Sequence, residues 1–140
     1  MTALTADRET ARKEEDVVSF PVYIATAIYK GSIVMLNSSG YLIPGADTAS
    51  CKFAGVAMEA VTAAEAVASG TKWLKVYRKG VFKLGANAIA QSNVGDLCYI
   101  YDDQTIEDAA GSVTNDIVCG KIVEYISATS CWVDIGDRVA

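Results

Sequence analysis

The chain begins with a polar, charged segment and changes abruptly at residue 17 to short apolar runs. Small, polar and charged residues alternate over residues 1–16, where Leu4 is the one large apolar side chain after Met1. Such a segment offers little to a core, and an isolated charged helix of this length is marginal in water. We therefore predict an extended, flexible N-terminal arm over residues 1–16, which at full extension would reach roughly 50 Å onto a neighbouring subunit.

From Val17 onward the apolar runs are rich in β-branched and aromatic residues and are separated by Gly, Pro, Asn and Asp. This pattern is typical of strands joined by turns. It predicts strands over 17–24 with an interruption at Pro21, 32–36, 41–44, 53–61, 72–82 with a bend at Gly80, 97–101, 117–126 with a break at Gly120, and 130–135. The hairpin turn is expected at 37–40, a loop or single helical turn at 62–69, and a short helical or turn segment at 87–93.

Seven to nine short strands at this spacing indicate a mostly β protein, a small β-barrel or sandwich. A chain of 140 residues with 51% hydrophobic and 21% charged residues suits one globular domain. No repeat or internal linker divides it, so the expected organisation is the arm, 1–16, followed by one β-barrel domain, 17–140.

Charge and hydropathy exclude two classes of partner. The net charge is −5, and the Lys and Arg residues are scattered along the sequence, so nucleic acid is not an expected partner. No stretch approaches the ~20 apolar residues that a membrane helix needs, and the N-terminus has no apolar leader. We expect a soluble protein made in the cytoplasm, with no membrane contact.

The residue types give little support to an enzyme or to a metal-binding protein. The chain has no histidine, the commonest general base and metal ligand, and no recognised nucleophile or phosphate-binding motif. Cys98, Cys119 and Cys131 lie in apolar runs, and together with Cys51 they form no C-x-x-C pair. We interpret them as reduced, buried hydrophobes, with disulfides or reactive thiols as the alternative. The prediction is a non-enzymatic protein with no cofactor and no metal site.

Asp102 and Asp103 form the one tight acidic pair of the body. Paired carboxylates can divide acid and base roles or bind a cation, but adjacent residues at a strand end point in opposite directions. A turn stabilised by Asx hydrogen bonding is the preferred interpretation.

Residues 72–79 follow a period-two pattern that indicates a half-exposed strand. Aromatic and basic residues lie on one side, and the residues that alternate with them are Lys72, Leu74, Val76 and Arg78. We predict a possible intersubunit face here, because Trp, Tyr and Arg are favoured interface anchors. Its candidate residues are Trp73, Tyr77, Arg78 and Phe82. The alternatives are a track for single-stranded nucleic acid, which the acidic remainder disfavours, and aromatics that simply fill the core with lysines in water.

These segments together resemble the capsid cement, or head-decoration, proteins of tailed phages. The matching pieces, in order, are TADRETAR, YKGSIVMLNSSGYLIPG, FAGVAMEAV, VYRKGVF, VGDLCYIYDDQTI, CGKIVEYI and WVDIG. The resemblance implies a β-barrel or β-tulip-like body on the outer capsid surface, often as a homotrimer, with the arm lying along the major capsid protein. The family carries no catalytic residues.

On this resemblance, the arm residues expected to bind capsid protein are Thr5, Asp7, Arg8, Thr10 and Arg12. A charged run of this kind can equally be solvated. Two other functions stay open at this point: a small ligand-binding or enzyme-accessory barrel, and another head or tail component of the virion.

Overall fold

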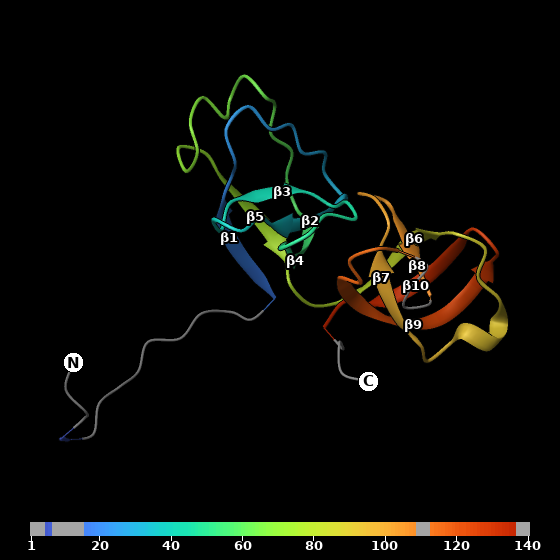
Figure 1. Ribbon diagram of the computed structural model, residues 1–140. Helices are drawn as coiled ribbons and strands as arrows, with labels where there is room; N and C mark the ends of the chain where they lie inside the picture. Colours follow the sequence, from blue (N-terminus) through green and yellow to red (C-terminus); the bar gives the residue numbers. More distant parts are fainter. Residues whose placement is uncertain (1–4, 7–15, 109–112, 137–140) are drawn as a thin grey trace.

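The computed structural model describes residues 5–6, 16–108 and 113–136 of the chain. These residues form a mostly β protein in which an open five-stranded sheet stands beside a closed five-stranded barrel (Figure 1). The predicted fold class is thereby confirmed. Of the predicted arm, only Thr5, Ala6 and Asp16 belong to the described residues.

The strands follow one another along the chain without mixing between the two units. The open sheet contains β1 (Val17–Pro21), β2 (Ile33–Leu36), β3 (Leu42–Pro44), β4 (Lys52–Ala57) and β5 (Trp73–Tyr77), in the antiparallel order β1-β5-β4-β2-β3. The barrel contains β6 (Val81–Ala86), the 3-10 turn η1 (Gln91–Asn93), β7 (Leu97–Ile100), β8 (Thr105–Glu107), β9 (Val118–Ser127) and β10 (Ser130–Asp134), closed in the order β10-β6-β8-β7-β9. The ten described strands exceed the predicted seven to nine because the strand predicted over 72–82 is two strands, β5 and β6, which belong to different sheets, and because β8 was not predicted.

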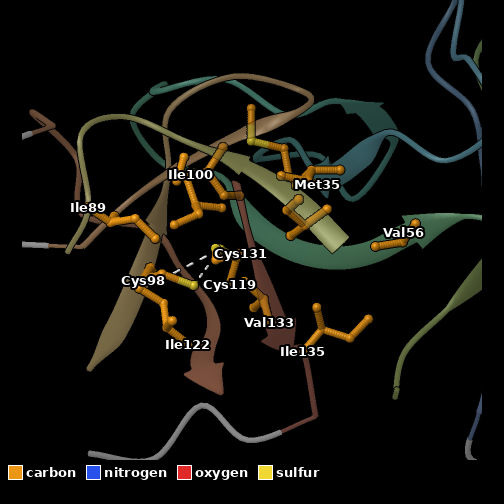
Figure 2. Packing of buried hydrophobic residues seen from close by; sticks show 14 residues of the cluster. Met35, Val56, Ile89, Cys98, Ile100, Cys119, Ile122, Cys131, Val133 and Ile135 are labelled. Atoms are coloured by element: carbon orange, nitrogen blue, oxygen red, sulfur yellow. Dashed lines mark hydrogen bonds between the residues drawn. The ribbon is translucent and has the colours of Figure 1, made fainter. Parts of the chain in front are cut away.

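One hydrophobic core joins the sheet to the barrel. Ile33, Met35 and Val56 of the open sheet are buried in the same cluster as the inward side chains of all five barrel strands (Figure 2). Each such side chain stabilises the fold by roughly 1.5–3 kcal/mol on burial. The opposite face of the sheet has a second core that includes Leu74 and Val76.

The second core is covered by two long loops that project from the sheet on the side away from the barrel (Figure 1). They are the segments 22–32 and 58–72, and they are bound to each other by backbone hydrogen bonds. Ile28 and Val61 form a bridge between them, and Ala25 N donates to Ala66 O at 2.8 Å. Residues 62–66 make the predicted helical turn, since Ala66 N donates to Thr62 O.

Pro21 is tolerated in β1 because β1 is an edge strand. Val22 N donates to Lys72 O and Arg78 N donates to Asp16 O, so the even-numbered residues of β1 turn their backbone groups toward β5. Pro21 therefore faces the open edge, where its missing N–H breaks no ladder bond.

Several strand boundaries differ from the prediction, and two of the differences have a clear physical cause. The strand predicted over 53–61 ends at Ala57, because the side chain of Glu59 takes the next place on β5 by accepting a hydrogen bond from Lys75 N. The strand predicted to break at Gly120 continues through it as β9. Gly120, with φ 157°, allows the backbone of Asp134 to approach closely, and the pairing of β9 with β7 continues past it after a register shift.

The barrel closes through a short parallel seam. β6 and β8 are paired at only two positions, Gly85 with Thr105 and Ala86 with Ile106, whereas β6 and β10 are paired at five. All other strand pairs of the barrel are antiparallel.

Polar contacts also hold the sheet to the barrel. Ile33 N donates to Asp103 O at 2.7 Å, which fixes the turn between β7 and β8 against β2. Asp47, in the loop after β3, accepts hydrogen bonds from Thr114 N at 2.6 Å and Asn115 N at 2.8 Å. The backbone donor of Thr114, followed by the donors of Asn115, lowers the pKa of the Asp47 carboxyl below its ordinary value.

Gly55 is required by the close approach of β4 to β5. Its φ is 150°, and an added Cβ would collide with the carbonyl oxygen of Tyr77. We expect Gly55→Ala to lower the free energy of unfolding by about 3 kcal/mol or more, from overpacking and an unfavourable φ together. Gly40→Ala, at φ 88° with no neighbour within 4 Å, should cost only about 1–2 kcal/mol. Equal losses in urea denaturation would contradict the steric explanation.

The Asp47 contacts predict a pH-dependent contribution to stability. Because the folded-state pKa lies below the ordinary value of 3.8, the stabilisation is complete above that value and is lost as pH falls through the folded-state pKa. We expect Asp47→Asn to lower the melting temperature at pH 7 and to differ less from wild type near pH 3. Glu124→Gln removes the same charge from an exposed position on β9 and controls for net charge. A difference that is the same at both pH values would refute the role of the carboxylate.

Candidate functional site

The predicted intersubunit residues are distributed along β5 and across the junction into β6. Tyr77 and Phe82 lie together, with ring centroids 5.5 Å apart and an interplanar angle of 44°. Trp73 lies at the other end of β5, roughly 13 Å from Tyr77 for four residues of strand. Arg78 is exposed just after β5. The structure thus brings Tyr77 and Phe82 together but leaves Trp73 apart from them.

Exposure separates the aromatic residues into two groups. Trp73 is 56% exposed, and its Nε1 donates to Gly70 O at 3.2 Å, which orients the indole on the surface. Tyr77 and Phe82 are half-buried, and Phe82 packs against the shared core. Trp73 therefore fits the prediction of an exposed intersubunit face, whereas Tyr77 and Phe82 are half-buried and also pack within the molecule.

β1 supplies part of the exposed surface around Trp73, and this contribution of β1 was not predicted from the sequence. The register places Val17 beside Tyr77, Ser19 beside Lys75 and Pro21 beside Trp73. Partners in an antiparallel pair share a face. We name these six residues the β1–β5 face. Pro21 is the residue that could have indicated this arrangement, because a proline inside a strand indicates an edge strand. The neighbour of such a strand can lie far away in the sequence.

The β1–β5 face lies on the same side of the sheet as the core shared with the barrel. Tyr77 is the register partner of Val56, whose side chain is buried in that core. The barrel covers β2 and β4, whereas Ser19, Lys75 and Trp73 remain exposed.

Of the predicted arm residues, only Thr5 belongs to the described part of the chain, where it is exposed. Asp7, Arg8, Thr10 and Arg12 lie outside the described residues. Their role in binding capsid protein stays a prediction.

Other large apolar side chains are also exposed, and the sequence reasoning did not single them out. Tyr29 is 73% and Val67 72% exposed, both on the two long loops. Tyr23 of the first loop lies beside Tyr41, with ring centroids 6.4 Å apart. The Ala-rich composition around Val67 gave no hint of its position.

The acidic pair forms the expected turn. Asp102 Oδ1 accepts a hydrogen bond from Gln104 N at 2.9 Å, an Asx turn that links β7 to β8. Both aspartates are half-buried against the sheet, more covered than a fully solvated turn would be.

Three thiols lie inside the barrel. Cys98, Cys119 and Cys131 are free and fully buried, and the Sγ atoms of Cys98 and Cys119 are 3.5 Å apart (Figure 2). The hydrogen bond to Cys119 and burial raise the pKa of the Cys98 thiol far above its ordinary value. Burial, with a smaller effect of Cys98, raises the pKa of Cys131 to about 11. Cys98 and Cys131 are therefore protonated, and all three cysteines pack as small, buried apolar side chains, as predicted.

Two further features bear on chemistry. A cavity of about 510 Å³ lies at the seam of the barrel, lined by Gly31, Lys83, Leu84, Gly85, Ala86, Gln104, Thr105 and Thr129. Among residues 5–6, 16–108 and 113–136 no group of three or more His, Cys, Asp or Glu side chains is arranged to hold a metal ion. Within the same ranges no helix is long and apolar enough to span a membrane.

The different burial of the thiols predicts selective labelling. Cys51 is half-buried, whereas the three barrel cysteines have no exposed area. We expect a thiol reagent such as Ellman's reagent to modify one cysteine in the native protein and the other three only on unfolding. Cys51→Ser should abolish the native reaction. Rapid labelling of that variant would show that the barrel core opens readily.

The described residues thus form a strand face with aromatic and basic side chains beside a barrel whose interior is apolar. No family model, no curated protein and no solved structure matches this chain.

Proposed function

We propose that this protein is a structural virion subunit that decorates and stabilises the outer surface of a phage capsid by binding major capsid protein. The observation that carries the proposal is Trp73, a largely exposed indole fixed on a rigid strand next to Lys75. A rigid exposed Trp gives a large contact area at little entropic cost, which suits a protein interface.

The resemblance to head-decoration proteins supports the same proposal. The matching segments YKGSIVMLNSSGYLIPG and FAGVAMEAV supply β2, β3 and β4, and VYRKGVF supplies the junction between β5 and β6. CGKIVEYI and WVDIG supply most of β9 and β10. A mostly β body with a small barrel is also the fold that the resemblance implies.

Mass action explains how a small subunit would strengthen a shell. A protein that binds only the expanded shell stabilises it by about 2.7 kcal/mol per site when its free concentration is 100 times its Kd. Many modest contacts therefore add up to a large effect on the whole particle. An arm that orders on binding covers a wide area but pays conformational entropy, so affinity per unit area is low.

The alternative of a small-ligand-binding barrel has one observation in its favour, the cavity at the seam between β6 and β8. Its volume lies in the range of small-molecule sites, about 300–1,000 Å³. Its lining has one charged side chain, that of Lys83, and consists otherwise of small, apolar and neutral polar residues. This lining lacks the converging polar groups expected of a specific site.

The role of the arm is tested by removing it. The deletion should cover residues 1–15, because the carbonyl of Asp16 accepts a hydrogen bond from Arg78 N and belongs to the folded body. We expect the shortened protein to keep its melting temperature but to bind expanded cognate capsids at least about tenfold more weakly in co-sedimentation.

Point variants sharpen this test. Arg8→Ala with Arg12→Ala should weaken binding, whereas Lys13→Ala removes a neighbouring charge that is not among the predicted contacts. Undiminished binding of the shortened protein would refute the arm's role. If the full chain added no density to the outer shell in electron microscopy, the proposed function itself would be refuted.

A further inference from the structure

Two of the three free cysteines inside the barrel are in contact with each other. Cys98 belongs to β7 and Cys119 to β9, and both side chains are fully buried in the shared core (Figure 2). Their Sγ atoms are 3.5 Å apart, and the Sγ of Cys119 lies 3.6 Å from the carbonyl oxygen of Cys98. Two adjacent thiols differ chemically from two separate ones, because oxidation can join them as a disulfide.

A bulge in β9 brings the two thiols together. Cys98 is the register partner of Gly120, and Tyr99 is that of Val118. Cys119 lies between these pairs as an extra residue of β9 with no register partner on β7. In a regular ladder its side chain would point to the face opposite to that of Gly120, and hence away from Cys98. Because a bulge places two residues opposite one, the thiol of Cys119 can turn inward as well.

The spacing of the two strands suits a disulfide. Residues opposed across an antiparallel pair have Cα atoms about 4.5–5.5 Å apart, and the Cα atoms joined by a disulfide are usually about 4.4–6.8 Å apart. The two sulfur atoms must approach by about 1.5 Å to form the bond, which side-chain rotation can supply. Cys131 is less suitably placed, since its strand β10 is not paired with β7 and its register partner on β9 is Tyr125.

We propose that Cys98 and Cys119 form a site of reversible oxidation by hydrogen peroxide, and that the resulting disulfide ties β7 to β9. In the first step the thiolate of one cysteine attacks a peroxide oxygen, the O–O bond breaks, and a sulfenic acid and water result. In the second step the other thiolate attacks the sulfenic sulfur, the S–S bond forms, and the sulfenic oxygen leaves as water. In total the two thiols lose two electrons and two protons to one peroxide, which leaves as two waters.

Burial makes this oxidation slow without preventing it. The thiolate is the nucleophile, and a thiol in an apolar core is seldom ionised. Oxidation therefore proceeds from transiently open states of the barrel, which peroxide can enter because it is little larger than water. The adjacent thiol then captures the sulfenic acid before a second peroxide can convert it to sulfinic acid. A single buried cysteine has no such protection.

The disulfide would stabilise the barrel. Cys98 and Cys119 are 21 positions apart, and the loop that they close contains β8. Closing such a loop reduces the entropy of the unfolded chain. The inference goes beyond the proposed function and does not depend on it. A virion subunit would nevertheless meet both redox states, because the cytoplasm keeps thiols reduced and the medium outside the cell does not.

Peptide mapping of the wild-type chain tests the pairing. Trypsin, which cuts after Lys and Arg, leaves Cys98 and Cys119 together in one peptide, 84–121. The other two cysteines fall in separate peptides, Cys51 in 31–52 and Cys131 in 122–138. The native protein is treated with hydrogen peroxide, and its remaining thiols are alkylated in denaturant. We expect the peptide 84–121 to be unalkylated and lighter by two hydrogen atoms, and dithiothreitol to restore both thiols.

Two matched variants test the effect on stability. Cys119→Ala and Cys131→Ala each remove one buried thiol from the same core. Both are made in Cys51→Ser protein, so that no thiol outside the barrel reacts. Peroxide should raise the melting temperature of the Cys131→Ala protein by roughly 5–10 °C, reversibly with dithiothreitol, and should not raise that of the Cys119→Ala protein. Oxidation of methionine would affect both variants alike.

The peptide map can overturn the pairing without any variant. The proposed pair is wrong if peptide 84–121 keeps both thiols, gains oxygen instead of losing hydrogen, or is joined to peptide 122–138. A disulfide that leaves the melting temperature unchanged, or lowers it, would overturn the stabilising role. Because every measurement uses free protein, a failure here is distinguishable from a failure to bind capsids.

Discussion

The fold depends on a hydrophobic core that two sheets share. The barrel alone spans only residues 81–134, and a unit of that size is marginally stable by itself because it buries a smaller share of its surface than a larger domain does. Ile33, Met35 and Val56 supply that help from the open sheet. Because these side chains belong to β2 and β4, the barrel covers the middle of the sheet; of β5 it contacts the end at Tyr77, whose ring lies against Phe82, and leaves Trp73 and Lys75 exposed. The exposed β1–β5 face is thus a consequence of where the core lies.

The sequence predicted most strands because their signals are local. The hairpin of β2 and β3 follows from its turn residues, where Asn37 Oδ1 accepts hydrogen bonds from Ser39 N and Tyr41 N. Period-two alternation placed Leu74 and Val76 on the side of β5 opposite to the aromatic and basic residues, and this is the buried side. Errors arose where a non-local contact decided the outcome, as with Glu59 ending β4 and the close approach of Asp134 at Gly120.

The candidate site was only partly predictable for the same reason. Residue types marked Trp73 as an interface anchor, but nothing in its neighbourhood along the chain revealed that Pro21, some fifty residues earlier, lies beside it. Strand pairing, which links distant segments, converts scattered residues into surfaces.

The short parallel pairing of β6 with β8 affects where the barrel opens locally. β8 is joined to each of its neighbours, β6 and β7, by a ladder of only two residue pairs, so transient opening should begin around β8 before the longer ladders of β9 and β10 separate. Hydrogens on the amides of Gly85 and Asn87, which bond to the carbonyls of Gln104 and Ile106, would then exchange with solvent ahead of those in β9 and β10. A partner that contacts β8 and holds it against β6 and β7 would therefore make the barrel more rigid when bound than when free.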